Sequence, residues 1–449
     1  MNTNIASDFQ RLLFLCNRFR VLFCKHKEIW LILLTITEKN IKIRTILNEG
    51  GVLHNMKKTL ILLLALILVI GSFTACGGAK EEAGDDSAAP TEVKIGINYE
   101  LSGAVATYGQ ASVDGIMMAF DEINAAGGIN GMKIVPVQID NKSDAAEATT
   151  IATKLMTEEG VVACLGPATS GNFMATIPVA MGNKIPVISA SATADEGVTT
   201  DANGNVNDYV FRLCFNDSFQ GITMANFASQ NLSAKTAVIV ADNSSDYAKG
   251  LAKNFKETFT ASGGTIVDEE AYVAKDKDFN AILTKIKGMD FDVIFLPGYY
   301  QEAGLIIKQA RDLGITQPVL GADGFDSPVL LELAGASALN DVYFSNHYSN
   351  LDQDPKVQDF IKAYKEKTGE EPNAFHALGY DLGQYIADAI SRAGSTDPTA
   401  IKDALASTKD FQGVTGTFSM GADHNPVKSA VVIGLKDGVQ DTSVKVDPK

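Results

Sequence analysis

Short apolar runs alternate with amphipathic segments from Glu92 onward, and this alternation limits the folds open to the chain. Residues 93–97 and 161–165 have the length and composition of buried strands, whereas residues 112–126 place Ile116 and Phe120 on one face of a helix. A strand–helix–strand rhythm predicts a parallel sheet with helices on both faces. The other elements predicted in this first part are strands at 133–139 and 186–190 and helices at 143–158 and 173–182.

The same rhythm starts a second time at residues 236–240. A helix is predicted at 247–262, and further strands at 265–267, 292–296 and 318–320. A chain of 449 residues is long enough for two such units. The sequence therefore predicts an α/β protein with two doubly wound parallel-sheet lobes.

The overall charge argues against a nucleic-acid partner. The chain has 38 Lys and Arg residues against 54 Asp and Glu residues, which gives a net charge of −16. A phosphate-binding surface needs clustered Lys and Arg, and no such cluster occurs outside the N-terminal stretch.

The five cysteines give no metal-site pattern, because no C-x-x-C pair occurs. Cys164 and Cys214 both follow apolar residues and are predicted to be free thiols in the core, with a disulfide as the alternative. We expect neither a metal nor a cofactor.

Ligands of doubly wound sheets bind beyond the carboxyl ends of the strands, so the residues after each apolar run are the candidate site. Ser170 and Thr193 follow two strands of the first unit. Their hydroxyls, together with the free N–H groups of the following helix starts, suit a carboxylate. The alternative is that both residues are ordinary helix N-caps.

The second unit offers the opposite chemistry at its strand ends. Asp323 suits an ammonium group, with a turn residue before Gly324 as the alternative. Tyr108, Tyr247 and Tyr299 supply rings that wall a ligand, or else pack in the core. A carboxylate binder combined with an ammonium binder indicates a site for an α-amino acid.

Several strings at these positions resemble the bacterial leucine/isoleucine/valine-binding proteins, the solute receptors of amino-acid ABC transporters. The most specific string is Asp-Glu-Ile-Asn-Ala-Ala-Gly-Gly-Ile-Asn-Gly at 121–131. Leu-Ser-Gly at 101–103, Tyr-Gly at 108–109, Asp-Phe at 278–279 and Pro-Gly-Tyr at 297–299 also match. The resemblance runs from about residue 92 to the C-terminus.

The resemblance implies a ligand site and a role for each residue in it. Ser170 and Thr193 resemble the ligands of the substrate carboxylate, and Ser191 contributes main-chain contacts. Asp323 stands where many members carry Glu to hold the ammonium. Four residues resemble the aromatic and apolar groups around the ligand: Tyr108, Tyr247, Tyr299 and Phe375. The small disulfide of some members is not expected.

The resemblance also implies a fold of the type I periplasmic-binding-protein kind, with a three-strand hinge. Lobe 1 is then expected at 92–213 and 346–420, and lobe 2 at 214–345 and 421–446. Binding would close the two lobes around the ligand.

The N-terminal part contains a secretory signal pattern at residues 56–75. Lys57 and Lys58 precede a run of twelve residues from Thr59 to Ile70 that is shorter than a membrane-spanning helix. Phe-Thr-Ala-Cys at 73–76 resembles a lipobox, so Cys76 is predicted to carry the lipid, and residues 76–91 form a flexible tether. An uncleaved N-terminal anchor is the alternative.

Residues 1–55 show no domain-sized pattern. Glu-Gly-Gly at 49–51 can be encoded by a ribosome-binding sequence a few codons before Met56. We therefore expect translation to start at Met56, and a real extension at 1–55 is the alternative.

The favoured function is a lipid-anchored, extracytoplasmic receptor that passes an amino acid, most simply an aliphatic one, to an ABC permease; we expect a monomer. The alternatives are a receptor of the same fold for an amide, urea or an aromatic acid, and a ligand sensor for a membrane signalling protein. An enzyme is not expected. After the signal only three histidines remain (His347, His376, His424), and neither a G-x-S-x-G elbow nor a G-x-G-x-x-G loop after the first strand is present.

Overall fold

The computed structural model describes residues 91–447, within a compact unit that spans Ala88–Lys449. The expectations for the extension at 1–55, the signal at 56–75, Cys76 and the tether up to residue 90 lie outside the described residues. Between residues 91 and 447, no helix is both long enough and apolar enough to cross a membrane.

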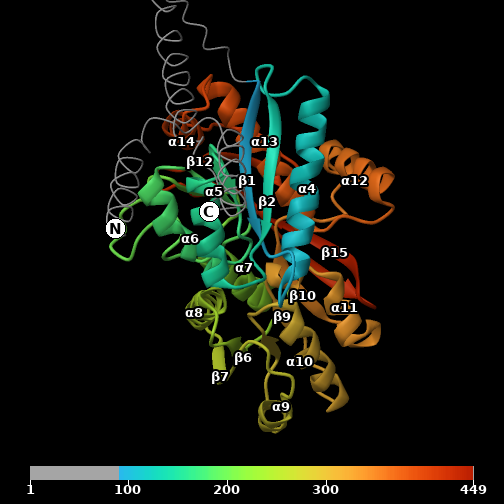
Figure 1. Cartoon of the computed structure of the whole chain (residues 1–449). Helices are drawn as coiled ribbons and strands as arrows, with labels where there is room; N and C mark the ends of the chain where they lie inside the picture. The colour runs from blue at the N-terminus through green and yellow to red at the C-terminus, as the bar shows by residue number, and fades with distance from the viewer. Residues whose placement is uncertain (1–90, 448–449) are drawn as a thin grey trace, which may run out of the picture. The chain divides into compact units, whose positions relative to one another are not determined.

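The first sheet has five parallel strands in the order β2-β1-β3-β4-β5. Its strands β3, β4 and β5 are buried on both faces, as parallel strands covered by helices are. Figure 1 shows β1 and β2 side by side, with α4 beside them. The strands are β1 (Glu92–Tyr99), β2 (Lys133–Asp140), β3 (Ala163–Leu165), β4 (Val187–Ser189) and β5 (Val210–Arg212).

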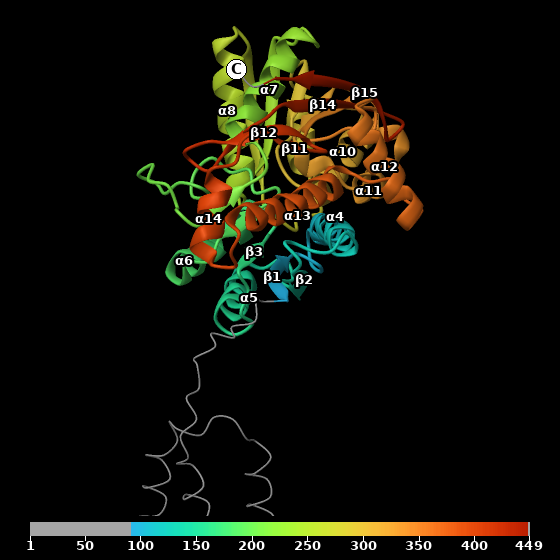
Figure 2. The same cartoon turned by 90° about the horizontal axis from the view of Figure 1, so that it is seen from above.

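Two long helices of this half, α4 and α13, pack with their backbones in close approach (Figure 2). A Cβ atom at Gly379 would lie 2.0 Å from the carbonyl oxygen of Ser112, so only glycine allows this contact. The helices of the first half are α4 (Ala106–Ala125), α5 (Ala145–Thr157), α6 (Ser170–Asn183), α12 (Pro355–Thr368), α13 (Ala374–Ala393) and α14 (Pro398–Ala406).

The second sheet has seven strands in the order β15-β14-β10-β9-β8-β6-β7. Five are parallel, and β14 and β15 extend the sheet as antiparallel strands. The strands are β6 (Thr236–Asp242), β7 (Thr265–Tyr272), β8 (Val293–Phe295), β9 (Val319–Gly321), β10 (Val342–Asn346), β14 (Ala430–Lys436) and β15 (Val439–Val446). A small third sheet contains β11 (Phe411–Gly413), β12 (Gly416–Met420) and β13 (Pro426–Val427).

The helices of the second half are α7 (Asp217–Gln230), α8 (Asp246–Ala261), α9 (Asn280–Lys287), α10 (Tyr300–Asp312) and α11 (Pro328–Ala334), with short 3-10 helices η1 (Asp323–Phe325) and η2 (Ala336–Leu339). Helices α7 and α8 pack against each other, as do α10 and α11. The α/β class with parallel sheets is as predicted. The antiparallel strands were not predicted. β15 is exposed along most of its length, whereas β14 is a buried apolar run whose direction in the sheet no local pattern indicates.

The chain passes between the two halves three times: after β5, after β10 and between β12 and β14. These crossings define a hinge region at about 213–216, 347–354 and 421–429. The residue limits of lobes 1 and 2 stay a prediction, and the halves are named below by their sheets.

The first helix begins six residues earlier than predicted, at Ala106 rather than at residue 112. The prediction was wrong because Gly109 looks like a helix breaker in the sequence. In the fold it serves close packing instead, since a Cβ atom there would lie 2.1 Å from the carbonyl oxygen of Glu100. Tyr108 therefore sits in the first turn of α4. Cys164 and Cys214 are buried and free, as predicted.

Candidate ligand-binding site

Ser170 is the first residue of α6, which follows β3 in the first sheet. The N-cap position belongs to Thr169, whose side chain does not cap the helix. Ser170 therefore does not act as the N-cap that was its alternative role. Its hydroxyl accepts a hydrogen bond from the backbone N–H of Ala194 at 3.1 Å, beside the first-turn N–H groups of α6 that lack partners within the helix.

The loop before α6 is held by Glu100, a fully buried residue that sequence reasoning missed. Its carboxylate accepts the backbone N–H groups of Ala168 and Thr169, at 2.9 and 3.1 Å. It also accepts the hydroxyl of Thr169 and the amide of Asn172, both at 2.9 Å. Four donors satisfy the buried charge and fix the backbone that presents Ser170. A glutamate directly after an apolar strand was the signal available in the sequence.

Ser191 and Thr193 lie in the loop after β4. The Ser191 hydroxyl donates to the carbonyl of Ala168 at 2.9 Å, so it ties this loop to the one before α6. The carbonyl of Thr193 accepts the N–H of Asp217 at 2.8 Å. The Thr193 hydroxyl is buried, and no residue from 91 to 447 forms a hydrogen bond with it.

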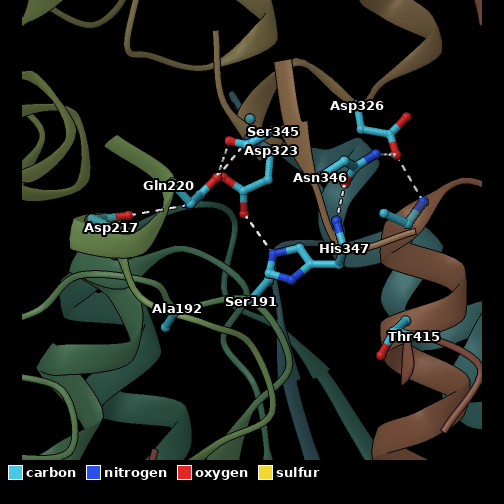
Figure 3. A network of polar contacts seen from close by, with 12 residues as sticks. Ser191, Ala192, Asp217, Gln220, Asp323, Asp326, Ser345, Asn346, His347 and Thr415 are labelled. Carbon is cyan, nitrogen blue, oxygen red and sulfur yellow. Dashed lines mark hydrogen bonds and ion pairs between the residues drawn. The ribbon is translucent and has the colours of Figure 1, made fainter. Parts of the chain in front are cut away.

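Asp323 is a buried acid at the carboxyl end of β9, and its side chain does not cap the 3-10 helix that it starts. Its Oδ1 accepts the hydroxyl of Tyr247 at 2.7 Å and the amide of Gln220 at 3.1 Å. Its Oδ2 lies 3.2 Å from Nε2 of His347 (Figure 3). Asp323 therefore occupies an organised polar network, which goes beyond the turn role that was its alternative.

The aromatic residues form a continuous wall. Tyr108 stacks on Phe375 with ring centroids 4.3 Å apart and meets Tyr299 edge to face at 5.7 Å. Tyr247 stacks on Tyr299 at 5.2 Å. Burial raises the pKa of Tyr108 and Tyr247 well above the ordinary value, so both hydroxyls remain protonated donors.

Seven of the eight predicted site residues line one cavity between the two halves, and Thr193 is not among its lining residues. The cavity has a volume of about 10 Å³, which is room for about one water molecule. Three lining residues were not predicted: Ala168, Thr169 and Gly324. The full lining is Tyr108, Ala168, Thr169, Ser170, Ser191, Tyr247, Tyr299, Asp323, Gly324 and Phe375.

Polar contacts close the cavity from the side of α4. The Tyr108 hydroxyl donates to the carbonyl of Gly324. Thr107 and Ser327 share a hydrogen bond between their hydroxyls at 3.0 Å, and Tyr300 donates to the carbonyl of Ala104 at 3.2 Å. The first half thus contributes the Ser170 hydroxyl to the cavity, and the second half contributes the Asp323 carboxylate.

Comparison with known proteins identifies this architecture. A family model described as "Periplasmic binding protein" matches residues 92–440. The chain belongs to the periplasmic binding protein family. The predicted resemblance is confirmed by a curated relative, Leu/Ile/Val-binding protein homolog 3 of Brucella melitensis, which is 31% identical over 74% of this chain and 88% of its own length.

Solved structures of this family agree with the fold. The substrate-binding protein LivJ of the Streptococcus pneumoniae branched-chain amino acid transporter, crystallised with isoleucine, is 45% identical, with a TM-score of 0.75 over 80% of this chain and 100% of that one. The leucine-binding protein LivK of Thermotoga maritima is 34% identical, with a TM-score of 0.74 over 79% and 99% of the two chains. As a periplasmic binding protein, the molecule is a solute receptor that works outside the cytoplasm.

Proposed function

We propose that this periplasmic binding protein captures a branched-chain amino acid and presents it to the permease of an ABC importer. The observation that carries the proposal is the pairing of Ser170, at the start of α6, with Asp323 on the opposite side of one cavity. Such a pair suits a zwitterion, because the helix start favours an anion and the acid favours a cation.

The proposed ligand contacts use groups from both halves. In this proposal the substrate carboxylate meets the Ser170 hydroxyl and the free N–H groups of the first turn of α6. The Thr193 hydroxyl, which does not line the closed cavity, joins them once the halves part. The ammonium is held by Asp323, with the main chain at Ser191 nearby. Rings from both halves then enclose an aliphatic side chain without offering it a charge: Tyr108, Tyr247, Tyr299 and Phe375.

Similarity supports the choice of a branched-chain substrate. The LivJ structure that shares 45% of its residues with this chain was crystallised with isoleucine. The rival receptor functions, for an amide, urea or an aromatic acid, have no need of an ammonium-binding acid, and so Asp323 discriminates among them.

Binding requires the two halves to part and close again. A cavity with room for about one water molecule does not admit an amino acid, so access depends on movement about the three hinge crossings. Closure then places Asp323 and the aromatic residues of the second half over a ligand that rests on α6.

The proposed role is binding without catalysis. Nucleophilic catalysis needs a Ser or Cys beside a base. Burial raises the pKa of the Cys164 thiol to about 12, so it stays protonated and unreactive. We expect the purified protein to return a bound amino acid chemically unchanged, which mass spectrometry checks.

We further propose that the receptor is a monomeric lipoprotein made from Met56, with Cys76 as its lipid-bearing first residue. The sequence pattern at 56–76 supports this proposal. Cys76→Ala should shift the protein from the membrane fraction to the soluble one. A changed Met56 codon should abolish the product, and undiminished product would overturn the proposed start.

A thermal-shift screen tests the ligand class. The purified protein is heated with each of the twenty amino acids, with simple carboxylates that lack an amine, with urea and with a simple amide. Leucine, isoleucine or valine should raise the unfolding temperature in proportion to the logarithm of its concentration above the dissociation constant. A response to carboxylates alone, or to urea or an amide, would overturn the amino-acid proposal.

A further inference from the structure

His347 is the first residue after β10, at the second hinge crossing, and it is 4% exposed. Its ring stacks on Phe215 of the first hinge crossing, with centroids 3.7 Å apart and an interplanar angle of 18°. Its Nε2 lies 3.2 Å from Oδ2 of Asp323. Figure 3 shows the ring directed at the Asp323 carboxylate, whereas the neighbouring Asn346 side chain donates to Asp326 at 2.8 Å.

The only polar contact of the His347 ring with residues 91–447 is the one between Nε2 and Asp323. Nδ1 is buried and has no hydrogen-bond partner among residues 91–447. Leaving a buried polar atom unpaired costs stability, so an apolar ring would fill this space better if packing were the only requirement. What the imidazole gains over an apolar ring is therefore the contact with Asp323.

The protonation of the ring follows from its neighbours. Burial lowers the pKa of His347, which keeps the ring neutral, although Asp323 acts in the opposite direction. Because Oδ2 of a carboxylate accepts, the neutral ring carries its hydrogen on Nε2 and donates it to Asp323.

The distribution of donors on Asp323 shows what this contact does. A carboxylate has about four acceptor positions, two on each oxygen. Tyr247 and Gln220 occupy both positions on Oδ1, whereas His347 occupies one on Oδ2. One position on Oδ2 is left for a further donor. His347 is the group that fixes where this position points.

We propose that His347 is a positioning residue that orients Oδ2 of Asp323 toward the ammonium group of the substrate. The inference rests on the proposed amino-acid function. Tyr247 and Gln220 hold one oxygen only, so without His347 the carboxylate tilts about Oδ1 and its open acceptor position is no longer fixed. All three donors to Asp323 are neutral, so no cationic side chain of the described residues contacts this acid. The substrate ammonium then supplies the opposite charge.

The test uses L-leucine titrated calorimetrically into the purified protein and four variants. His347→Leu removes the donor, and His347→Asn places its amide nearer the Nδ1 position, out of reach of Asp323. His347→Gln keeps a donor near the Nε2 position. His424→Leu is the matched control, because His424 lies at the third hinge crossing and also stacks on a phenylalanine, Phe211 of β5, at 4.0 Å, but is bonded to the Val210 carbonyl.

We expect His347→Leu and His347→Asn to weaken leucine binding on the order of tenfold or more, as the loss of a hydrogen bond to a charged group does. His347→Gln should restore most of the affinity, and His424→Leu should stay within about twofold of the parent protein. Equal losses in His347→Leu and His424→Leu, or no difference between His347→Gln and His347→Asn, would overturn the inference. If His347→Leu does not fold, the comparison of His347→Gln with His347→Asn tests the inference.

A parent protein that does not bind leucine would instead overturn the proposed function.

Discussion

The hydroxyl of Tyr108 donates a hydrogen bond to the main-chain carbonyl of Gly324, 216 positions further along the chain. Tyr108 lies in the first turn of α4 in the first half, and Gly324 follows Asp323 in the second. One side chain thus joins the wall of the cavity to the loop that carries the acid. Its contribution to closure can be measured without removing the ring.

Tyr108→Phe keeps the ring and its stack on Phe375 but removes the donor to Gly324. We expect leucine affinity to fall roughly two- to tenfold, because a neutral hydrogen bond contributes about 0.5–1.5 kcal/mol. Calorimetry measures the change. Tyr348→Phe is the control, since the buried Tyr348 hydroxyl has no partner in the described chain. Equal effects of the two variants would contradict a closing role for Tyr108.

Glu100→Gln tests the support of the carboxylate-binding loop. In the parent protein both Glu100 oxygens accept N–H groups. In the variant an NH₂ group, which cannot accept, replaces one of these oxygens, so the free energy of unfolding should fall by about 1–3 kcal/mol. Leucine affinity should fall as well, because the loop presents Ser170. Urea unfolding and calorimetry measure the two effects. Glu147→Gln, at an exposed surface ion pair, is the control and should change neither by more than about 0.5 kcal/mol. Unchanged stability of Glu100→Gln would show that the four hydrogen bonds are dispensable.

Lys428 predicts a pH dependence of stability. It is buried at the third hinge crossing, where Nζ donates to the Thr415 hydroxyl at 2.6 Å, and Thr415 donates to Asp381. Burial lowers the pKa of Lys428 to about 8, whereas an unfolded lysine titrates near 10.5. Between these values the unfolded chain binds more protons than the folded one, so this residue makes stability rise with pH, by up to about 3 kcal/mol.

The measurement is urea unfolding of the parent protein and of Lys428→Met from pH 7.5 to 10.5. Buried groups such as Cys164, whose pKa is raised to about 12, make stability fall with pH. The prediction therefore concerns the difference in free energy of unfolding between the parent protein and Lys428→Met. That difference should increase with pH in favour of the parent protein. A difference that does not vary with pH would contradict the lowered pKa of Lys428.

The sequence predicted the fold well where hydrophobic runs are strong and local. The buried strands at 93–97 and 161–165 and the restart at 236–240 all lie within strands of the two sheets or beside them. The antiparallel pair β14 and β15 was not predicted: β15 is largely exposed and has no clear apolar pattern, and the place of the apolar run of β14 in the sheet depends on its distant partner β10. The start of α4 was predicted too late because Gly109 resembles a helix breaker. Glycine is needed there for close packing against the backbone of Glu100, which is a tertiary contact.

The candidate site divides in the same way. Ser170 and Asp323 could be selected because the rule that strand ends form sites depends only on local order along the chain. Glu100 and His347 also follow strands directly, and Gln220 lies within α7. Their roles could not be assigned from the sequence, because each depends on a partner distant along the chain: Asn172 is 72 positions from Glu100, and Asp323 is 103 from Gln220. Sequence patterns indicate which oxygens face a ligand, whereas the residues that orient those oxygens emerge only from packing.

The central claim is that Asp323 recognises the ammonium of an amino acid, and calorimetric titration of L-leucine into the protein and into Asp323→Asn tests it most directly. Asn keeps the shape of the side chain but removes its charge. We expect one leucine per parent chain and a loss of about thirtyfold or more in the variant, since an unpaired buried charge costs about 2 kcal/mol or more. Unchanged leucine affinity in Asp323→Asn would contradict the account.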